Sequence, residues 1–242
     1  MSNVVKVAAF GSCRIFTPLA RARSQGLIET THTGIEWYTH STLEALQKAN
    51  IVECIRPVPD EFIPLLIDTR EKHNGEFHSS NKFNDTDVIV LEISTLKKIE
   101  FEGWYLQQWR VANLKSGLAT DAPEESVRIA RAAVITEVLA NEFLEHLEAF
   151  RLRLGKPLVI VPHLTCPSFP EAVLRPRLKI RRLIERFCEQ HEGAVMYDPT
   201  PTVVTHGEEV ALVDSGHYQP PFNKVIGVEL GEACRALHLQ LA

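Results

Sequence analysis

Short apolar runs alternate with longer amphipathic segments along this chain. Runs rich in valine and isoleucine predict four buried β-strands, at residues 4–10, 88–93, 158–161 and 194–197. A fifth strand is expected from either residues 34–38 or residues 51–55. Apolar positions at helical spacing predict helices between them, at about residues 13–25, 41–50, 59–72, 123–154, 171–191 and 221–239.

This alternation predicts an α/β fold, because parallel strands joined by right-handed crossovers place helices on both faces of the sheet. We expect a three-layer α/β/α sandwich around a central parallel sheet of about five strands. The chain has 242 residues, of which 45% are apolar. That length suits one full-sized domain and is short for two, so residues 1–242 are expected to form a single domain.

Two segments lack a regular pattern. Residues 73–87 are polar and are expected to form a surface loop, whereas residues 97–122 carry Trp104, Tyr105 and Trp109. Aromatic side chains are costly to expose, so this second excursion is expected either to pack against the sheet or to cover a substrate as a lid.

The charge pattern argues against two classes of partner. There are 26 basic and 31 acidic side chains, a formal net charge of −5, with no long run of either sign, so binding to nucleic acid is not expected. We see no basic-then-apolar leader and no stretch of roughly 18 apolar residues. A cytoplasmic protein without a membrane span is therefore expected.

The five cysteines lack the spacing of a disulfide framework and are expected to be reduced thiols: Cys13, Cys54, Cys166, Cys188 and Cys234. Cys188 and Cys234 lie in apolar helical patterns and are expected in the core. His163 and Cys166 have a spacing that can ligate a metal, but no second pair accompanies them at zinc-finger spacing, so no metal site is expected.

Cys13 differs from the other cysteines because it lies where the first strand meets a helix, in Gly11-Ser12-Cys13-Arg14. A thiol on such a turn is exposed, and the N–H groups of a helix N-terminus favour its thiolate. Near the other end of the chain, Asp214 precedes His217 by three residues. A thiol, an imidazole and an orienting carboxylate are the parts of a nucleophilic triad.

The two motifs together resemble those of the SGNH, or GDSL-like, hydrolase superfamily. There, the first strand ends in Gly-Asp-Ser with serine as nucleophile, and an aspartate precedes the base by three residues near the C-terminus. Cys13 stands at the serine's position and Ser12 at the aspartate's. The cysteine form is similar to GSCFA-domain proteins and to acetyltransferase-like proteins of capsular polysaccharide synthesis. The resemblance implies a catalytic triad of Cys13, His217 and Asp214.

The middle of the chain departs from the superfamily pattern. The superfamily stabilises the oxyanion with a glycine and with the asparagine of Gly-x-Asn-Asp, but here the strand at 88–93 is followed by Ser94-Thr95-Leu96. A hydroxyl could replace the asparagine, and Thr39-His40-Ser41 could occupy the place of the glycine. The candidate oxyanion or substrate-binding residues are Ser12, Arg14, Ser41, Ser94 and His163. On the exposed first turn of a helix, Arg14 would more commonly be solvated.

The function implied is acyl transfer through a thioester on Cys13, with water or a sugar hydroxyl as acceptor. The substrate would be a small molecule or a carbohydrate. No cofactor is required, but coenzyme A thioesters are candidate acyl donors. The alternative is a catalytically degenerate SGNH-like protein that binds a small ligand in the same crevice. A nucleotide-binding flavodoxin-like domain is disfavoured because no phosphate-binding glycine loop follows a strand, and a cysteine phosphatase because Leu19 occupies the position of its arginine. The sequence leaves the oligomeric state open.

Overall fold

The computed structural model describes residues 4–31, 38–53, 55–66, 83–118 and 122–241. Its central sheet has five parallel strands in the order β2-β1-β3-β7-β8. Their bounds are β1 Val5–Phe10, β2 Ile28–Thr30, β3 Val88–Ile93, β7 Leu158–Pro162 and β8 Ala194–Met196. The expected α/β fold and four of the five strands are confirmed.

The fifth strand is not where it was expected. It is β2, a short edge strand, whereas Ile51 and Val52 end a helix instead of forming a strand. The other expected position, residues 34–38, lies outside the described residues except for its last member. Three residues with one buried side chain leave too short a pattern for sequence periodicity to detect.

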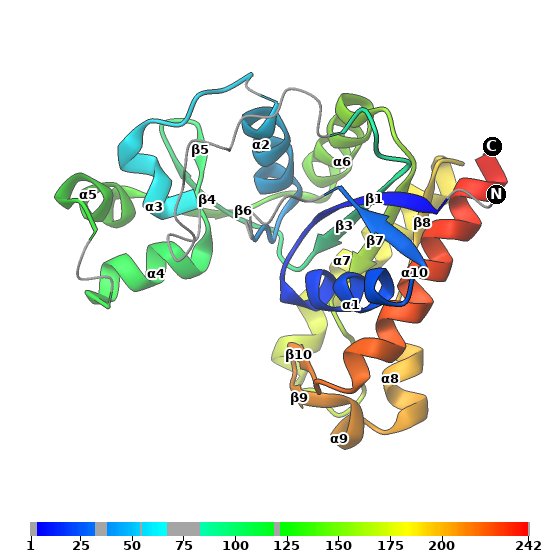
Figure 1. Ribbon diagram of the computed structural model, residues 1–242. Coiled ribbons are helices and arrows are strands. Elements are labelled where there is room, and N and C mark those ends of the chain that lie inside the picture. Colours follow the sequence, from blue (N-terminus) through cyan, green and yellow to red (C-terminus); the bar gives the residue numbers. More distant parts are fainter. Residues whose placement is uncertain (1–3, 32–37, 54, 67–82, 119–121, 242) are drawn as a thin grey trace.

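Helices cover both faces of the sheet (Figure 1). One face packs on α1 (Cys13–Ser24) and α10 (Phe222–Leu241), through strand residues such as Val7 and Ala9. The other face packs on α2 (Thr42–Val52), α6 (Ala140–Leu154) and α7 (Glu171–Gln190), through the alternate strand residues. The three-layer sandwich expected from the strand–helix alternation is therefore present.

The prediction of one long helix at residues 123–154 is wrong, because a strand interrupts this segment. The chain forms α5 (Glu124–Ala132), then β6 (Val134–Glu137), then α6. β6 pairs antiparallel with β4 (Lys97–Phe101), which also pairs with β5 (Trp104–Tyr105). Val134, Ile135 and Thr136 are all β-branched, so they suit a strand once a partner strand is available.

The segment at 97–122 was expected to be irregular. It contributes β4, β5 and α4 (Gln108–Ser116) to a hydrophobic cluster separate from those on the two faces of the central sheet. Trp104 stacks on Phe62 with ring centroids 4.9 Å apart. Of the helix expected at 59–72, the described part comprises a 3₁₀ turn, η1 (Asp60–Phe62), and α3 (Ile63–Leu66). Most of the loop expected at 73–87 lies outside the described residues.

The strand order places a crevice at the carboxyl ends of β1 and β3. In open α/β sheets, ligands bind where neighbouring strands send their connections to opposite faces. Here α1 follows β1 on one face, whereas α6, in the connection that leaves β3 and enters β7, packs on the other face. Beyond the sheet lie α8 (Thr200–His206), α9 (Glu208–Ala211) and the hairpin of β9 (Leu212–Asp214) and β10 (His217–Tyr218).

Among the described residues, no helix combines the length and the apolar character needed to cross a bilayer.

The close packing of α1 on α10 can be tested at Gly227. A Cβ there would lie 2.4 Å from the backbone oxygen of Pro18, whereas one at Gly231, on the same helix, would make ordinary contacts from 3.4 Å outward. Gly227→Ala should therefore lower the free energy of unfolding by about 1–3 kcal/mol. Gly231→Ala, which gains helix propensity, should be neutral or stabilising. Urea unfolding of both variants measures this, and equal effects would contradict the packing.

Candidate active site

A cavity of about 320 Å³ opens at the carboxyl edge of the sheet. It brings together residues that are distant in the sequence, including both terminal motifs. The described residues that line it are Ser12, Cys13, Arg14, Tyr38, His40, Ser94, Gln107, Trp109, His163, Gly216 and His217. Cys13 and His217 therefore line the same cavity.

Cys13 is partly exposed as the first residue of α1. Ser12 is the N-cap, and its hydroxyl accepts a hydrogen bond from the Arg14 N–H at 3.3 Å. The N–H groups of Arg14 and Ile15 bond to Ser12, so among the first-turn groups the Cys13 N–H is the one left to face an anion at this end. The strand–turn–helix context predicted for Cys13 is present.

His217 and Asp214 form a hydrogen-bonded pair across the β9–β10 hairpin. The Nδ1 atom of His217 lies 2.9 Å from both carboxylate oxygens of Asp214. Although partial burial opposes it, the hydrogen bonds from the Gly216 N–H and from His217 lower the pKa of Asp214. The carboxylate is thus ionised at neutral pH, and its contact with Nδ1 leaves Nε2 for the other side of the ring.

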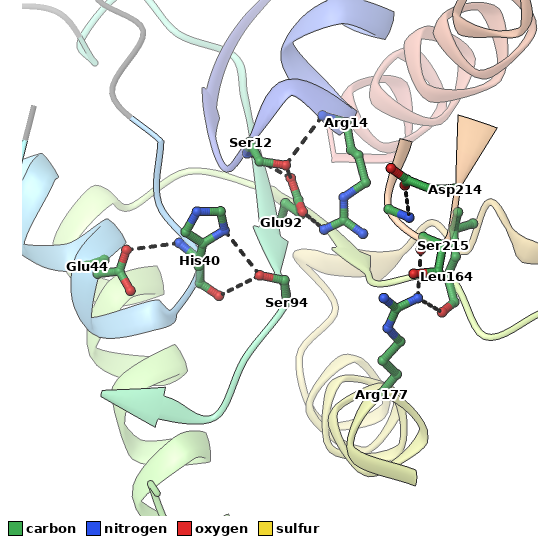
Figure 2. Close-up of polar contacts among 11 residues, drawn as sticks. Ser12, Arg14, His40, Glu44, Glu92, Ser94, Leu164, Arg177, Asp214 and Ser215 are labelled. Carbon is green, nitrogen blue, oxygen red and sulfur yellow. Dashed lines mark hydrogen bonds and ion pairs between the residues drawn. The ribbon is translucent and has the colours of Figure 1, made fainter. Parts of the chain in front are cut away.

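Arg177, which sequence reasoning missed, holds this hairpin in place. Its Nη1 atom donates hydrogen bonds to the backbone oxygen of Ser215 at 2.8 Å and to that of Leu164 at 2.9 Å. Figure 2 shows the guanidinium reaching from α7 to the turn beside Asp214. Because Leu164 lies just after β7, Arg177 ties the Asp214–His217 turn to the central sheet. It is a positioning residue, and an arginine in a basic helix gives no sequence signal for such a role.

Glu92 was also missed, and it is buried directly behind the Cys13 turn. Its Oε2 atom accepts hydrogen bonds from the Ser12 N–H at 2.8 Å and from the Ser12 hydroxyl at 2.7 Å. Its other oxygen forms an ion pair with Arg14, as Figure 2 shows. Glu92 is the one charged residue in the apolar strand β3, and that signal could have identified it.

Arg14 is not solvated, contrary to the simpler expectation for a first-turn arginine. Its side chain is 7% exposed and paired with Glu92. Burial lowers the pKa of Arg14 to about 10, which still leaves the guanidinium charged at neutral pH. Arg14 lines the cavity, but its charge is already balanced by the carboxylate.

Two histidines of the cavity are held neutral. Burial and the nearby charge of Arg14 lower the pKa of His40 to about 4, and the same two causes bring the pKa of His163 far below its usual range. The Ser94 hydroxyl lies 3.3 Å from His40 Nδ1 and 3.4 Å from the His40 carbonyl oxygen (Figure 2). A neutral imidazole still offers one N–H donor. The cavity therefore has side-chain donors although the Asn-Asp motif is absent.

The remaining candidates fall into two groups. Ser94 and His163 line the cavity as predicted, but Ser41 is not among the described residues that do. The Ser41 hydroxyl instead caps α2 and donates to Glu44 at 3.0 Å, so its predicted contact with substrate is not supported. Trp109 lines the cavity and is 52% exposed, which keeps the lid hypothesis for this one aromatic residue.

The other cysteines lie apart from the cavity lining. Cys166 and Cys234 are buried in apolar clusters and Cys188 packs against the core, while Cys54 lies outside the described residues. Within the described part of the chain, no group of three histidine, cysteine, aspartate or glutamate side chains has the arrangement of a metal site.

Comparison with protein families gives a match to the TviD N-terminal domain, over residues 5–125 and again over residues 112–233. The Vi polysaccharide biosynthesis protein TviD of Salmonella typhi is 28% identical over 106 residues. That alignment covers 44% of this chain and 12% of the relative, so the chain corresponds to a small part of that protein's length.

Solved structures similar to this chain have low sequence identity. A protein of Slackia heliotrinireducens described as an SGNH hydrolase is 9% identical with a TM-score of 0.49, over 95% of this chain and 98% of that one. A carbohydrate esterase family 3 protein of Talaromyces cellulolyticus is 10% identical with a TM-score of 0.47, over 99% and 100% of the two chains.

The buried Glu92–Arg14 pair predicts a large effect of a small substitution. Glu92→Gln keeps the size of the side chain but leaves the Arg14 guanidinium buried without a counter-charge, which should lower the free energy of unfolding by about 3 kcal/mol or more. The matched control is Glu125→Gln, which removes the carboxylate of the exposed pair with Arg128 and should change little. Urea unfolding measures both, and similar losses in the two variants would refute the role of burial.

The cysteines should differ in their rate of alkylation. Burial raises the pKa of Cys166 and of Cys234 to about 12 and that of Cys188 to about 11, so their thiolates are scarce at neutral pH. Cys13 is partly exposed in the cavity and should react first with iodoacetamide. Peptide mass spectrometry after brief treatment measures the order. Slower labelling of Cys13 than of these three would identify it as a structural thiol.

Proposed function

Because this chain belongs to the TviD N-terminal domain family, we propose that it is an acyl-transfer enzyme that acts on a carbohydrate, with Cys13 as nucleophile. The observation that carries the proposal is that Cys13 lines one cavity with His217, whose ring is hydrogen-bonded to Asp214. The Salmonella relative is described as a polysaccharide biosynthesis protein, which supports a sugar as the acyl acceptor.

In the first step the thiol of Cys13 loses its proton to Nε2 of His217, and the sulfur attacks the carbonyl carbon of an acyl donor. The resulting imidazolium is stabilised by Asp214, whose carboxylate contacts Nδ1. When the tetrahedral intermediate collapses, the bond to the leaving group breaks and His217 returns the proton to that group. The acyl chain is then held as a thioester on Cys13.

In the second step His217 removes a proton from the acceptor hydroxyl, whose oxygen attacks the thioester carbon. The carbon–sulfur bond breaks, and the departing Cys13 sulfur takes the proton from His217, which restores the starting thiol. A sugar hydroxyl as acceptor makes the protein a transferase, and water makes it an esterase or thioesterase. The same residues serve both outcomes, so access of the acceptor decides between them.

The oxyanion formed in both steps needs donors. The backbone N–H of Cys13 is one candidate, and the neutral rings of His40 and His163, which line the cavity, are two others. One such donor contributes roughly 3 kcal/mol to the stability of a transition state. Their neutrality matters, because a donor imidazole must keep its proton without adding a charge that the cavity would have to solvate.

Acylation of Cys13 is directly measurable. An activated aryl acetate should release phenol in a burst equal to the amount of protein and add an acetyl mass to the Cys13 peptide. Cys13→Ala should abolish both signals, whereas Cys188→Ala, which removes a half-buried thiol of α7, should leave them unchanged. His217→Ala should slow the burst by at least about 100-fold, the usual effect of losing general acid–base help.

If folded, reduced protein gives no burst with short or long acyl donors, the proposed chemistry is wrong. The chain would then fit a protein that binds a small ligand in this cavity without reacting with it.

A further inference from the structure

A second, larger groove of about 1430 Å³ adjoins the cavity. The two share four lining residues, namely His40, Ser94, Trp109 and His163. One wall of the groove is α7, and Lys97 and Glu137, from the paired strands β4 and β6, contribute to its lining. A ligand could therefore extend from the cavity into the groove without leaving the protein surface.

The α7 wall carries a row of cations. Arg175, Lys179, Arg182 and Arg186 all line the groove, and their spacing of four, three and four residues places them on one face of the helix. At a rise of about 1.5 Å per residue, the row extends over about 16 Å. Because α7 follows β7 and leads into the parallel strand β8, the row begins at the cavity edge of the sheet and runs away from it.

Most of these charges have no counter-charge. Lys179 pairs with Glu137 at 2.7 Å, but within the described part of the chain Arg175, Arg182 and Arg186 have no ion pair or hydrogen bond. Glu137 is also the one acidic residue among the described lining of the groove. Such a concentration of like charge is unfavourable by itself and is stabilised by an anionic ligand.

The cavity has the opposite character. Arg14 is the one arginine or lysine among its described lining residues, and Glu92 neutralises it. Arg177, which lies on the same helix as the row, donates hydrogen bonds to two backbone carbonyl oxygens. The combined site therefore fits a ligand whose reacting end is neutral and whose distant end carries several negative charges.

We propose that the groove binds the phosphate groups of an acyl-coenzyme A donor, with the thioester in the cavity at Cys13. This inference rests on the acyl-transfer function proposed above. Coenzyme A joins a neutral arm, which ends in the sulfur, to a nucleotide that carries a pyrophosphate and a further phosphate. Arginine is suited to this task, because its planar guanidinium forms paired hydrogen bonds with phosphate oxygens.

The donor step then balances as follows. The Cys13 sulfur bonds to the acyl carbon, the carbon–sulfur bond to coenzyme A breaks, and the departing thiolate takes the proton held by His217. The exchange replaces one thioester by another, so it needs no further reactant. The arginine row holds the released coenzyme A by its phosphates until it dissociates.

Binding of free coenzyme A tests the groove without turnover. Isothermal titration should give a Kd at least about tenfold weaker for Arg182→Gln/Arg186→Gln than for the unmodified protein, because two charged hydrogen-bond donors are lost. Arg235→Gln, which removes an exposed arginine of α10, is the matched control and should not change the Kd. Pantetheine, which lacks phosphates, should bind all three proteins equally.

The result that overturns the proposal is an unchanged Kd for coenzyme A in the double variant, or no binding to the unmodified protein. The proposal would also be overturned if the double variant lost affinity for an oligogalacturonate but not for coenzyme A. That result would assign the groove to a carboxylate-bearing sugar chain. The aryl acetate burst separates the two proposals, since that donor has no phosphate. An absent burst refutes the acyl-transfer function, while the coenzyme A titration still decides the groove.

Discussion

The carboxylate of Glu92 is the interaction on which the site depends. It lies in the middle layer, 1% exposed, and binds both the backbone and the hydroxyl of Ser12 as well as the Arg14 guanidinium. These contacts fix β3 to the turn that joins β1 to α1, and Cys13 follows that turn as the first residue of α1. A buried carboxylate is tolerated because an opposite charge and two hydrogen bonds compensate its loss of water. The position of Cys13 is therefore set by a residue that is not among the described lining of the cavity.

Gly11 is the steric condition for this arrangement. A Cβ at Gly11 would lie 2.6 Å from the Glu92 Cβ, 2.6 Å from Ile15 Cδ1 and 2.9 Å from Glu92 Oε2. Only the absence of a side chain lets the strand end approach the carboxylate so closely. The three residues of the Gly-Ser-Cys sequence thus have separate roles. Gly11 leaves room for the Glu92 carboxylate, Ser12 binds it, and Cys13 begins the helix.

The central parallel sheet was predicted from the sequence better than the smaller antiparallel sheet of β4, β5 and β6. Four strands were found because each is a short run of mostly apolar residues, which has few interpretations in an α/β chain. The interruption of the helix at 123–154 was missed, because Val134 and Val138 also fit a helical stripe and the pairing of β6 with β4 is a long-range contact. The cavity was predictable from its two end motifs. The role of Arg177 was not predictable, and the isolated charge of Glu92 marks that residue without identifying its partner, since their contacts are with residues 38 and 80 positions away.

The cavity and the adjoining groove differ in how their charges are balanced. In the cavity, Arg14 is matched by Glu92, and His40 and His163 are kept neutral by burial and by that same arginine. Asp214 remains charged because it is more exposed and accepts hydrogen bonds from the hairpin. A cavity without a free cation does not hold an anionic leaving group tightly. The uncompensated charges among the described residues lie instead on α7, along the adjoining groove.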